Sequence, residues 1–134
     1  MELLEMRLTE FEKIKKTRGL SSEQRDQFNK TADFVCRNLA DYFELEPEDL
    51  KKKTKKREIL FPRQIAHYQL AEENKKIFKK EYWSLIARLF GMKVSTVIHS
   101  YSMIDGWKNL PTPEGREIRE VLGLFKNHWI SYRK

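Results

Sequence analysis

Apolar residues recur every three or four positions along most of the chain, which is the spacing of amphipathic helices. The first such segment lies within residues 1–20 and ends at Gly19, a residue type that often closes a helix. Its apolar stripe consists of Leu4, Leu8, Phe11 and Ile14. A second helix is predicted to begin after Ser21, which has the capping-box spacing to Gln24. Its stripe consists of Phe28, Ala32, Val35, Leu39 and Tyr42.

The middle of the chain alternates polar stretches with shorter apolar ones. Pro47 interrupts the second helix, because proline opposes helix continuation. Residues 51–57 hold six cations and no apolar residue, which predicts an exposed loop or arm. Pro62 suits the first turn of a third helix, and the polar run at residues 72–76 predicts a turn after it. The apolar side of this third helix consists of Ile65, Ala66 and Leu70.

The remaining segments also predict helices. A fourth covers about residues 79–90, with Gly91 as its cap, and Ser95 can cap a fifth. The apolar residues of the fifth helix are Val97, Ile98, Tyr101 and Ile104. A stiff linker at residues 110–113 precedes the last helix, whose apolar residues are Ile118, Leu122, Phe125 and Trp129. No segment alternates as a strand does. We therefore predict an all-α fold, with residues 1–30 as a helical extension and residues 31–134 as a small helical bundle.

Length and composition narrow the classes of function. The chain has 134 residues, the size of one domain. Neither its single cysteine nor its three separated histidines have a metal-ligand spacing, and its five glycines form no phosphate-cradling loop. We therefore expect no metal, no nucleotide or other cofactor, and no enzymatic activity. No run approaches the roughly 18 apolar residues of a membrane helix, so we expect no membrane partner. The N-terminus is acidic, unlike that of a secretory signal, and we expect a cytoplasmic, nucleoid-associated protein.

The net charge of +7 is unevenly distributed. Residues 21–50 carry a net charge of −5, whereas residues 51–90 carry a net charge of +8. An oriented positive field of this kind favours nucleic acid as a partner, because cations that neutralise phosphates release counterions. An anionic membrane fits less well, since no helix pairs a basic face with a large aromatic one. Charge alone also leaves open a solvated lysine-rich surface with no partner.

The two helices predicted on either side of residues 91–94 have the pattern of a helix-turn-helix, in which a short glycine-containing turn joins two helices. In the second of them, Ser95, His99 and Ser102 point away from the apolar side, with Thr96 and Met103 beside them. These side chains are uncharged or weakly basic and none is acidic, as a helix that enters the major groove requires. An ordinary helical hairpin has the same kind of turn, so the turn alone does not distinguish it from a DNA-binding motif. The positive charge of the neighbouring segment favours DNA binding.

Two motifs in this part of the chain resemble a known family. Residues 55–68, KKREILFPRQIAHY, are similar to the opening of the C-terminal DNA-binding domain of the bacterial replication initiator DnaA. Residues 86–91, IARLFG, and 95–100, STVIHS, are similar to its signature helix-turn-helix. The resemblance covers roughly residues 31–125. It implies a helical bundle with a helix-turn-helix, as in the Trp repressor and the DnaA C-terminal domain, and the family's ATPase domain has no counterpart.

The resemblance and the charge pattern together imply a set of DNA-contacting residues. Lys55 stands where the family places an arginine in the minor groove, and Val94 stands at the position of a family histidine whose Asp-His pair is lost. A valine can touch a thymine methyl but cannot form a hydrogen bond. The full set is Lys55, Lys56, Arg57, Arg63, Gln64, Lys79, Lys80, Lys93, Val94, Ser95, Thr96, His99 and Ser102.

Two functions remain after this reasoning. The first is sequence-specific binding of double-stranded DNA, in replication initiation, its control, or transcription regulation of a bacterial or mobile element. The second is a protein-interaction module on the same scaffold that has lost specific DNA reading. The stripe on the N-terminal helix could dock on the domain, pair two copies of the chain or bind another protein. A structured-RNA binder is a weaker alternative, since no aromatic-rich sheet motif supports it.

Overall fold

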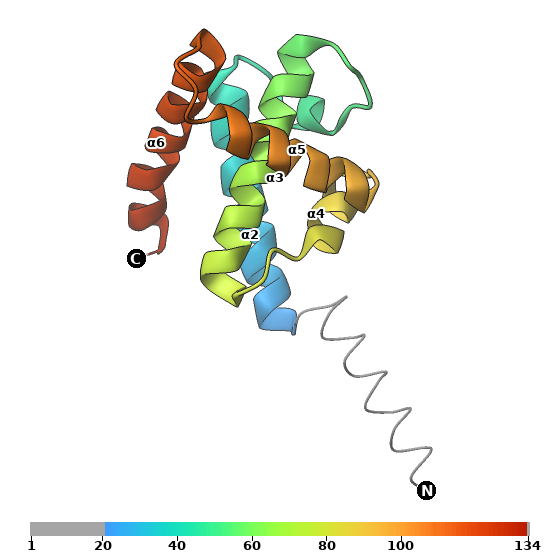
Figure 1. Ribbon diagram of the computed structural model, residues 1–134. Coiled ribbons are helices and arrows are strands. Elements are labelled where there is room, and N and C mark those ends of the chain that lie inside the picture. Colours follow the sequence, from blue (N-terminus) through green and yellow to red (C-terminus); the bar gives the residue numbers. More distant parts are fainter. Residues whose placement is uncertain (1–20, 134) are drawn as a thin grey trace, which may run out of the picture.

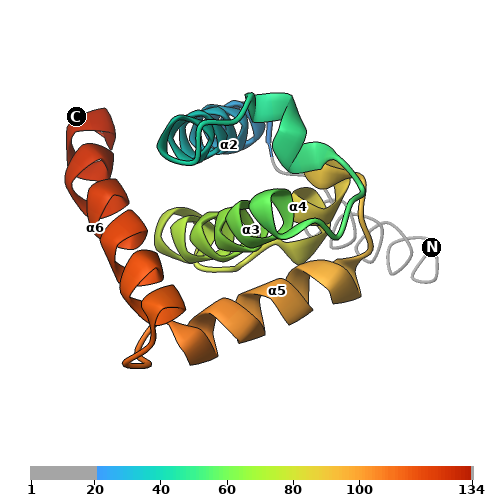
Figure 2. The same ribbon diagram turned by 90° about the horizontal axis from the view of Figure 1, so that it is seen from above.

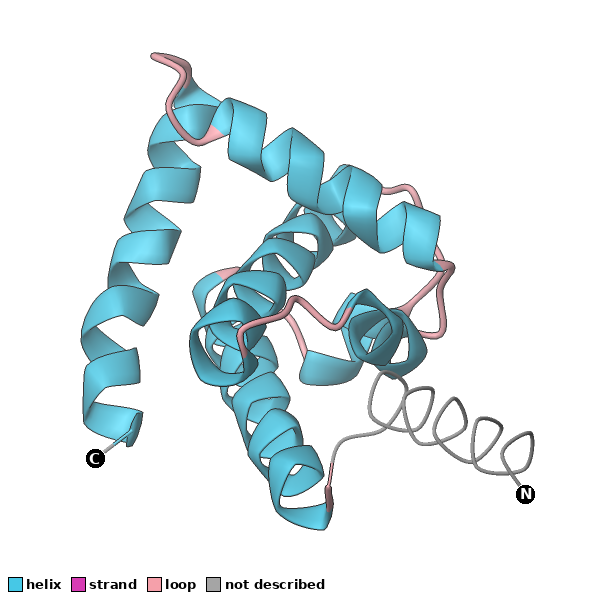
Figure 3. Ribbon diagram, turned by 60° about the horizontal axis from the view of Figure 1, so that its bottom comes forward, coloured by secondary structure: helices cyan, strands magenta, loops and turns pink. Residues whose placement is uncertain are grey.

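The computed structural model describes the backbone of residues 21–133 and the side chains of residues 21–126. The helix predicted within residues 1–20, and the side chain of Trp129, lie outside these described parts. The described elements are α2 (Ser22–Tyr42), the 3-10 helix η1 (Pro47–Lys51), α3 (Arg57–Phe78), α4 (Trp83–Phe90), α5 (Val94–Trp107) and α6 (Pro113–Arg133). Within residues 21–133 there are helices and loops but no strand, which confirms the all-α prediction (Figure 3).

Helix α3 lies at the centre of the molecule and contacts most of the other elements (Figure 1). Figure 2 shows α2 and α5 on opposite sides of α3, with α6 crossing from the end of α5 toward α2. The core forms where these helices meet. Its largest fully buried apolar side chains come from every described element and are Val35, Leu39, Leu50, Ile65, Leu70, Ile86, Phe90, Val97, Ile104 and Ile118. Each stabilises the fold by about 2 kcal/mol through removal of apolar surface from water.

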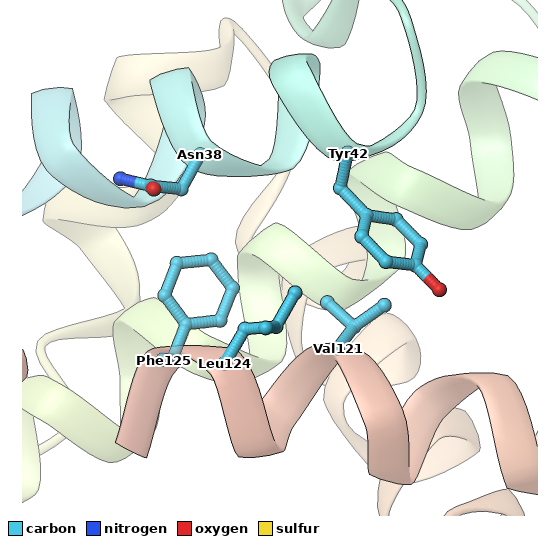
Figure 4. A pocket seen from close by; sticks show the side chains of 5 residues that line it. All are labelled: Asn38, Tyr42, Val121, Leu124 and Phe125. Atoms are coloured by element: carbon cyan, nitrogen blue, oxygen red, sulfur yellow. The ribbon is translucent and has the colours of Figure 1, made fainter. Parts of the chain in front are cut away.

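The start of α2 is fixed by the capping box that the sequence predicts. The Ser21 hydroxyl oxygen accepts the Gln24 N–H at 3.2 Å, and the Gln24 side-chain oxygen accepts the Ser21 N–H at 3.0 Å. The far end of α2 meets α6, where Val121, Leu124 and Phe125 point toward Asn38 and Tyr42 (Figure 4). These contacts hold the last helix against the body of the domain.

Helix α3 begins earlier and ends later than the sequence predicts. Pro62 is the sixth residue of the helix, not part of its first turn. The carbonyl that Pro62 cannot bond belongs to Glu58, which lies in the exposed first turn, where water can satisfy it. The polar run at residues 72–76 is helical, not a turn. Asn74 is buried and donates to the Glu81 carbonyl at 2.6 Å, and Lys75 pairs with Glu72 at 2.7 Å, so tertiary contacts and ion pairs override the local composition.

The fourth helix is shorter than predicted. Instead of starting near residue 79, α4 starts at Trp83. Lys79 ends α3 in the left-handed conformation at φ 67°, and Tyr82 has φ 53°. Two left-handed residues within four positions cannot belong to a right-handed helix, so residues 79–82 form the connection.

His67 lies at the centre of the core. It is fully buried, its ring contacts Phe90 edge-on with centroids 4.5 Å apart, and neither ring nitrogen has a hydrogen-bond partner among the described residues. Burial, and to a lesser extent the positive charge of Arg63, lowers the pKa of His67 to about 3. The imidazole is therefore neutral in the folded chain at any pH above that value.

The stability of the domain should fall as the pH drops below 6.5. The unfolded chain binds a proton at His67 near pH 6.5, whereas the folded chain does not until about pH 3. Between these values each pH unit costs about 1.4 kcal/mol, so the free energy of unfolding should lose about 2 kcal/mol from pH 7 to pH 5. Urea denaturation at both pH values measures this loss. His67→Leu should reduce the loss, and an unchanged loss in that variant would contradict the assignment.

A pair of glycines on α6 gives a second test. At Gly115 an added Cβ would overlap the Leu110 carbonyl oxygen and lie 2.7 Å from the Trp107 carbonyl oxygen, whereas at Gly123 it would meet nothing within 4 Å. Gly115→Ala should therefore lower the free energy of unfolding by about 2 kcal/mol. Gly123→Ala should raise it by about 0.5 to 1 kcal/mol through helix propensity. Thermal or urea unfolding of both variants measures these changes in the free energy of unfolding. Equal changes in the two variants would contradict the close approach of Gly115 to the carbonyl oxygens at the end of α5.

Candidate nucleic-acid interface

Helices α4 and α5 are joined by a tight turn at residues 91–93. Gly91 has φ 62°, the left-handed conformation predicted for it, and the Met92 N–H donates to the Ala87 carbonyl at 2.9 Å. The cap of α5 differs from the prediction. Lys93, not Ser95, is the N-cap residue, and no side chain caps this end. The helix therefore begins at Val94, and the Lys93 carbonyl accepts the N–H groups of Thr96 and Val97 at 3.0 and 3.3 Å.

One side of α5 is fixed on the core. Val97 and Ile104 are fully buried, as the helical spacing predicts. The Tyr101 ring stacks on the Tyr68 ring of α3 with centroids 4.9 Å apart, and Lys75 donates to the Tyr101 hydroxyl at 3.0 Å. These contacts set the rotation of α5 about its own axis, and thus decide which residues face outward.

The outward side of α5 carries little charge. Beyond Lys93 in the turn, the exposed residues of its first two turns are Val94, Ser95, Thr96, Ile98 and His99, followed by Ser102. The structure thus brings together all six residues that the sequence predicts on this helix and its turn. Asp105, one turn further on, is the acidic residue on this helix, and it pairs with Lys108 at 2.9 Å.

Ile98 belongs to this surface, although the sequence pattern groups it with the apolar residues of the fifth helix. Its exposed fraction is 40%, whereas that of the adjacent Val97 is 0%. The sequence signal for this difference is the 100° step between neighbouring helix residues, since Val97 and Ile104 together define the buried side.

A basic loop, residues 51–57, leads from η1 into α3 and is exposed, as predicted. Lys52 pairs with Asp49 at 2.6 Å, and this hydrogen bond lowers the pKa of the Asp49 carboxyl. Arg57 pairs with Glu114 at 3.7 Å. The other exposed lysines of the loop, Lys51, Lys53, Lys55 and Lys56, have no salt bridge within the described residues. Their charges are available to an external anion.

Arg63 and Gln64 do not lie on the surface where the sequence analysis places them. Their exposed fractions are 6% and 7%. The Arg63 guanidinium donates to the Lys52 carbonyl oxygen, and Gln64 donates to the Met103 sulfur at 3.7 Å. Both side chains are turned inward in this structure, and their contact with DNA stays a prediction. Arg63 instead anchors the basic loop to α3, and Gln64 links α3 to α5.

Lys79 and Lys80 are exposed in the connection before α4, but they lie far from the basic loop. The 22 residues of α3 separate the two cation groups, a distance of about 33 Å along the helix axis. In contrast, the basic loop and the turn before α5 lie on the same side of the molecule, on the right in Figures 1 and 2. Lys53 of the loop and Arg88 of α4 are further exposed cations, which the sequence patterns did not single out.

Two helices joined by a glycine turn, with the second helix exposed beside a basic loop, define a helix-turn-helix protein. The family model described as the bacterial dnaA protein helix-turn-helix matches residues 32–104, which is more than half of the chain. The chain therefore belongs to this family. The matched residues run from α2 to the end of the buried stripe on α5, and α6 lies beyond them.

Membership of this family indicates a general function. The DnaA helix-turn-helix domain binds DNA and is not itself catalytic, so DNA is the partner of this domain. Among residues 21–133, no helix has the length and apolar composition that a membrane span requires.

The anchoring role of Arg63 is open to direct test. Arg63→Met should remove the side-chain donor to the Lys52 carbonyl, which also accepts the Thr54 N–H at 3.0 Å, and should loosen the basic loop. Amide hydrogen exchange at residues 52–56 should therefore become faster by about tenfold. Arg57→Met removes an exposed cation of the same loop and should leave this exchange nearly unchanged. Equal exchange in Arg63→Met and in the unaltered chain would show that Arg63 does not hold the loop.

Proposed function

We propose that this protein binds double-stranded DNA sequence-specifically, with α5 in the major groove and the basic loop on the adjacent backbone and minor groove. The observation that carries the proposal is the outward side of the first two turns of α5, which has no acidic residue and lies next to four lysines that have no salt bridge within the described residues. A helix about 10–12 Å in diameter fits a major groove about 12 Å wide. Acidic residues on that face would repel the phosphates, and none is present in its first two turns.

The residues take different roles in this arrangement. Lys93, Val94, Ser95 and Thr96 occupy the turn and first helical residues, where helix-turn-helix proteins contact bases. The exposed hydroxyl and imidazole groups of Ser95, Thr96, His99 and Ser102 can donate or accept hydrogen bonds at base edges. Lys55 would enter the minor groove, as the family resemblance implies. Lys56, Arg57, Lys79 and Lys80 would contact phosphates.

The recognised sequence should differ from the nonamer box of the initiator. Val94 stands where the family has a histidine, and it cannot form that residue's hydrogen bond to a base. The family relationship favours a role in replication initiation or its control, and regulation of transcription is the other role open to a sequence-specific DNA-binding protein of this kind.

Binding at graded salt concentrations tests this function. The chain is titrated with an initiator nonamer duplex, with a randomised duplex pool from which tight binders are selected, and with heparin. The proposal predicts that one selected duplex binds at least tenfold more tightly than the pool at moderate salt. Equal binding of the selected duplex, the pool and heparin would contradict specific reading. Absence of binding to all three would favour a protein partner.

The basic loop makes a separate prediction about salt. Lys56→Ala and Arg57→Ala should each weaken binding to every duplex and reduce the slope of log K against log salt by about 1, because each removes one phosphate contact. Lys126→Ala, an exposed lysine on α6, is the matched control and should leave both quantities unchanged. If Lys126→Ala has the larger effect, then the DNA lies on another side of the protein.

A further inference from the structure

A groove runs along α2 where this helix faces α4 and η1. It consists of two adjoining cavities of about 210 and 380 Å³, which share Asn29 and Leu89 in their walls. Along it lie three apolar residues of α2, spaced about one turn apart: Phe28, Ala32 and Cys36. These three span about 12 Å of the helix axis. A groove of this kind between helices is suited to the apolar side of a further amphipathic helix.

The sequence just before α2 has the pattern of such a helix. Residues 1–18 are followed by the two-residue connection Gly19–Leu20, and α2 starts directly after Ser21. Their apolar stripe is Leu4, Leu8, Phe11 and Ile14. An isolated helix of this length is marginal in water, so the stripe needs a surface to pack on. We propose that residues 1–18 form a helix that folds back antiparallel to α2 and packs in this groove.

The short connection fixes which residues meet. The two helices run in opposite directions from it with the same rise per residue, as in a helical hairpin. Leu4 then lies level with Cys36. Leu8, one turn later, lies level with Ala32. Phe11 falls beside the smaller cavity, so the apolar stripe follows the apolar line of the groove in both direction and spacing.

Charged residues are compatible with the same register. The smaller cavity has Arg25 and Arg88 in its lining and no acidic residue, and Glu12 falls beside it. Neither arginine has a salt bridge within the described residues. Arg7 falls beside the larger cavity, which two carboxylates and one lysine line. Lys15 falls level with Arg25, and both of these long side chains can extend into solvent.

A second copy of the chain or a different protein is a weaker occupant of this groove. Ser21 lies only about one turn from Arg25 at the near end of the groove, so the segment is attached to the groove by a very short linker. Such a linker gives an effective concentration in the millimolar range, which favours the chain's own segment over a free partner. No residue of α5 lines the groove, so the inference does not depend on the proposed DNA binding.

Contacts between methyl groups test the proposal in the full chain. With ¹³C-labelled Leu and Ile methyl groups, nuclear Overhauser effects should connect Leu8 with Leu89 and Ile14 with Leu85. Dilution with unlabelled chain should leave these effects at the same strength relative to the methyl signals, because both partners belong to one chain.

A matched pair of double variants tests the apolar stripe. Leu8→Asp with Phe11→Asp should abolish the contact between Ile14 and Leu85 and shift the Leu85 and Leu89 methyl signals. Met6→Asp with Thr9→Asp introduces the same number of charges on the opposite side of the helix and should leave both the contact and the signals unchanged. Circular dichroism checks that each variant is folded.

Three results would overturn the proposal. The first is the absence of any effect between residues 1–14 and Leu85 or Leu89 in the unaltered chain, a result that needs no variant. The second is an effect that fades as unlabelled chain is added, because the groove would then hold the segment of a second copy. The third is the same loss of contacts in both double variants, because the apolar side of the segment would then have no special role.

Discussion

The fixed rotation of α5 against α3 is the constraint on which the rest of the structure depends. Val97 and Ile104 bury one side of α5, and the stacked rings of Tyr68 and Tyr101 hold it laterally. Lys108 also reaches back to donate to the Tyr68 hydroxyl at 2.8 Å. With these contacts in place, only one side of α5 can face a ligand. In its first two turns that side has mostly small side chains, no acidic residue and a partly apolar surface, a combination that is suited to a groove lined with base edges.

The same central helix positions the cations. Arg63, near the start of α3, reaches the Lys52 carbonyl and so ties the basic loop to the helix that carries α5. Arg63, which the family resemblance places among the DNA contacts, thus holds the loop in this structure. The unpaired lysines lie on the basic loop, whereas the surface of α5 that would contact bases carries little charge. Binding affinity and sequence specificity would therefore come from different parts of the protein. Phosphate contacts fix position, whereas contacts to base edges select sequence.

Local signals in the sequence predicted much of this architecture. The Ser21–Gln24 capping box, the Gly91 turn and the buried stripe through Val97 are each set by residues close together in the chain, and each is confirmed. The errors arose where distant contacts decide. Residues 72–76 are helical because the Asn74 side chain donates to the Glu81 carbonyl and other helices pack on several sides of α3. No pattern among neighbouring residues predicts these distant contacts. The burial of Arg63 depends in the same way on the path of the loop above it. The exposure of Ile98 was within reach of helical geometry, since its neighbour Val97 marks the buried side.

Chemical-shift mapping tests the central claim most directly, because it reports where DNA lies without requiring any variant. The ¹⁵N-labelled chain would be titrated with a short mixed-sequence duplex at low salt. If α5 is the reading helix, the largest amide shifts should fall in residues 53–57 and 93–99, with little change in residues 114–126. Largest shifts on α2 or α6, with the first two turns of α5 unperturbed, would contradict it.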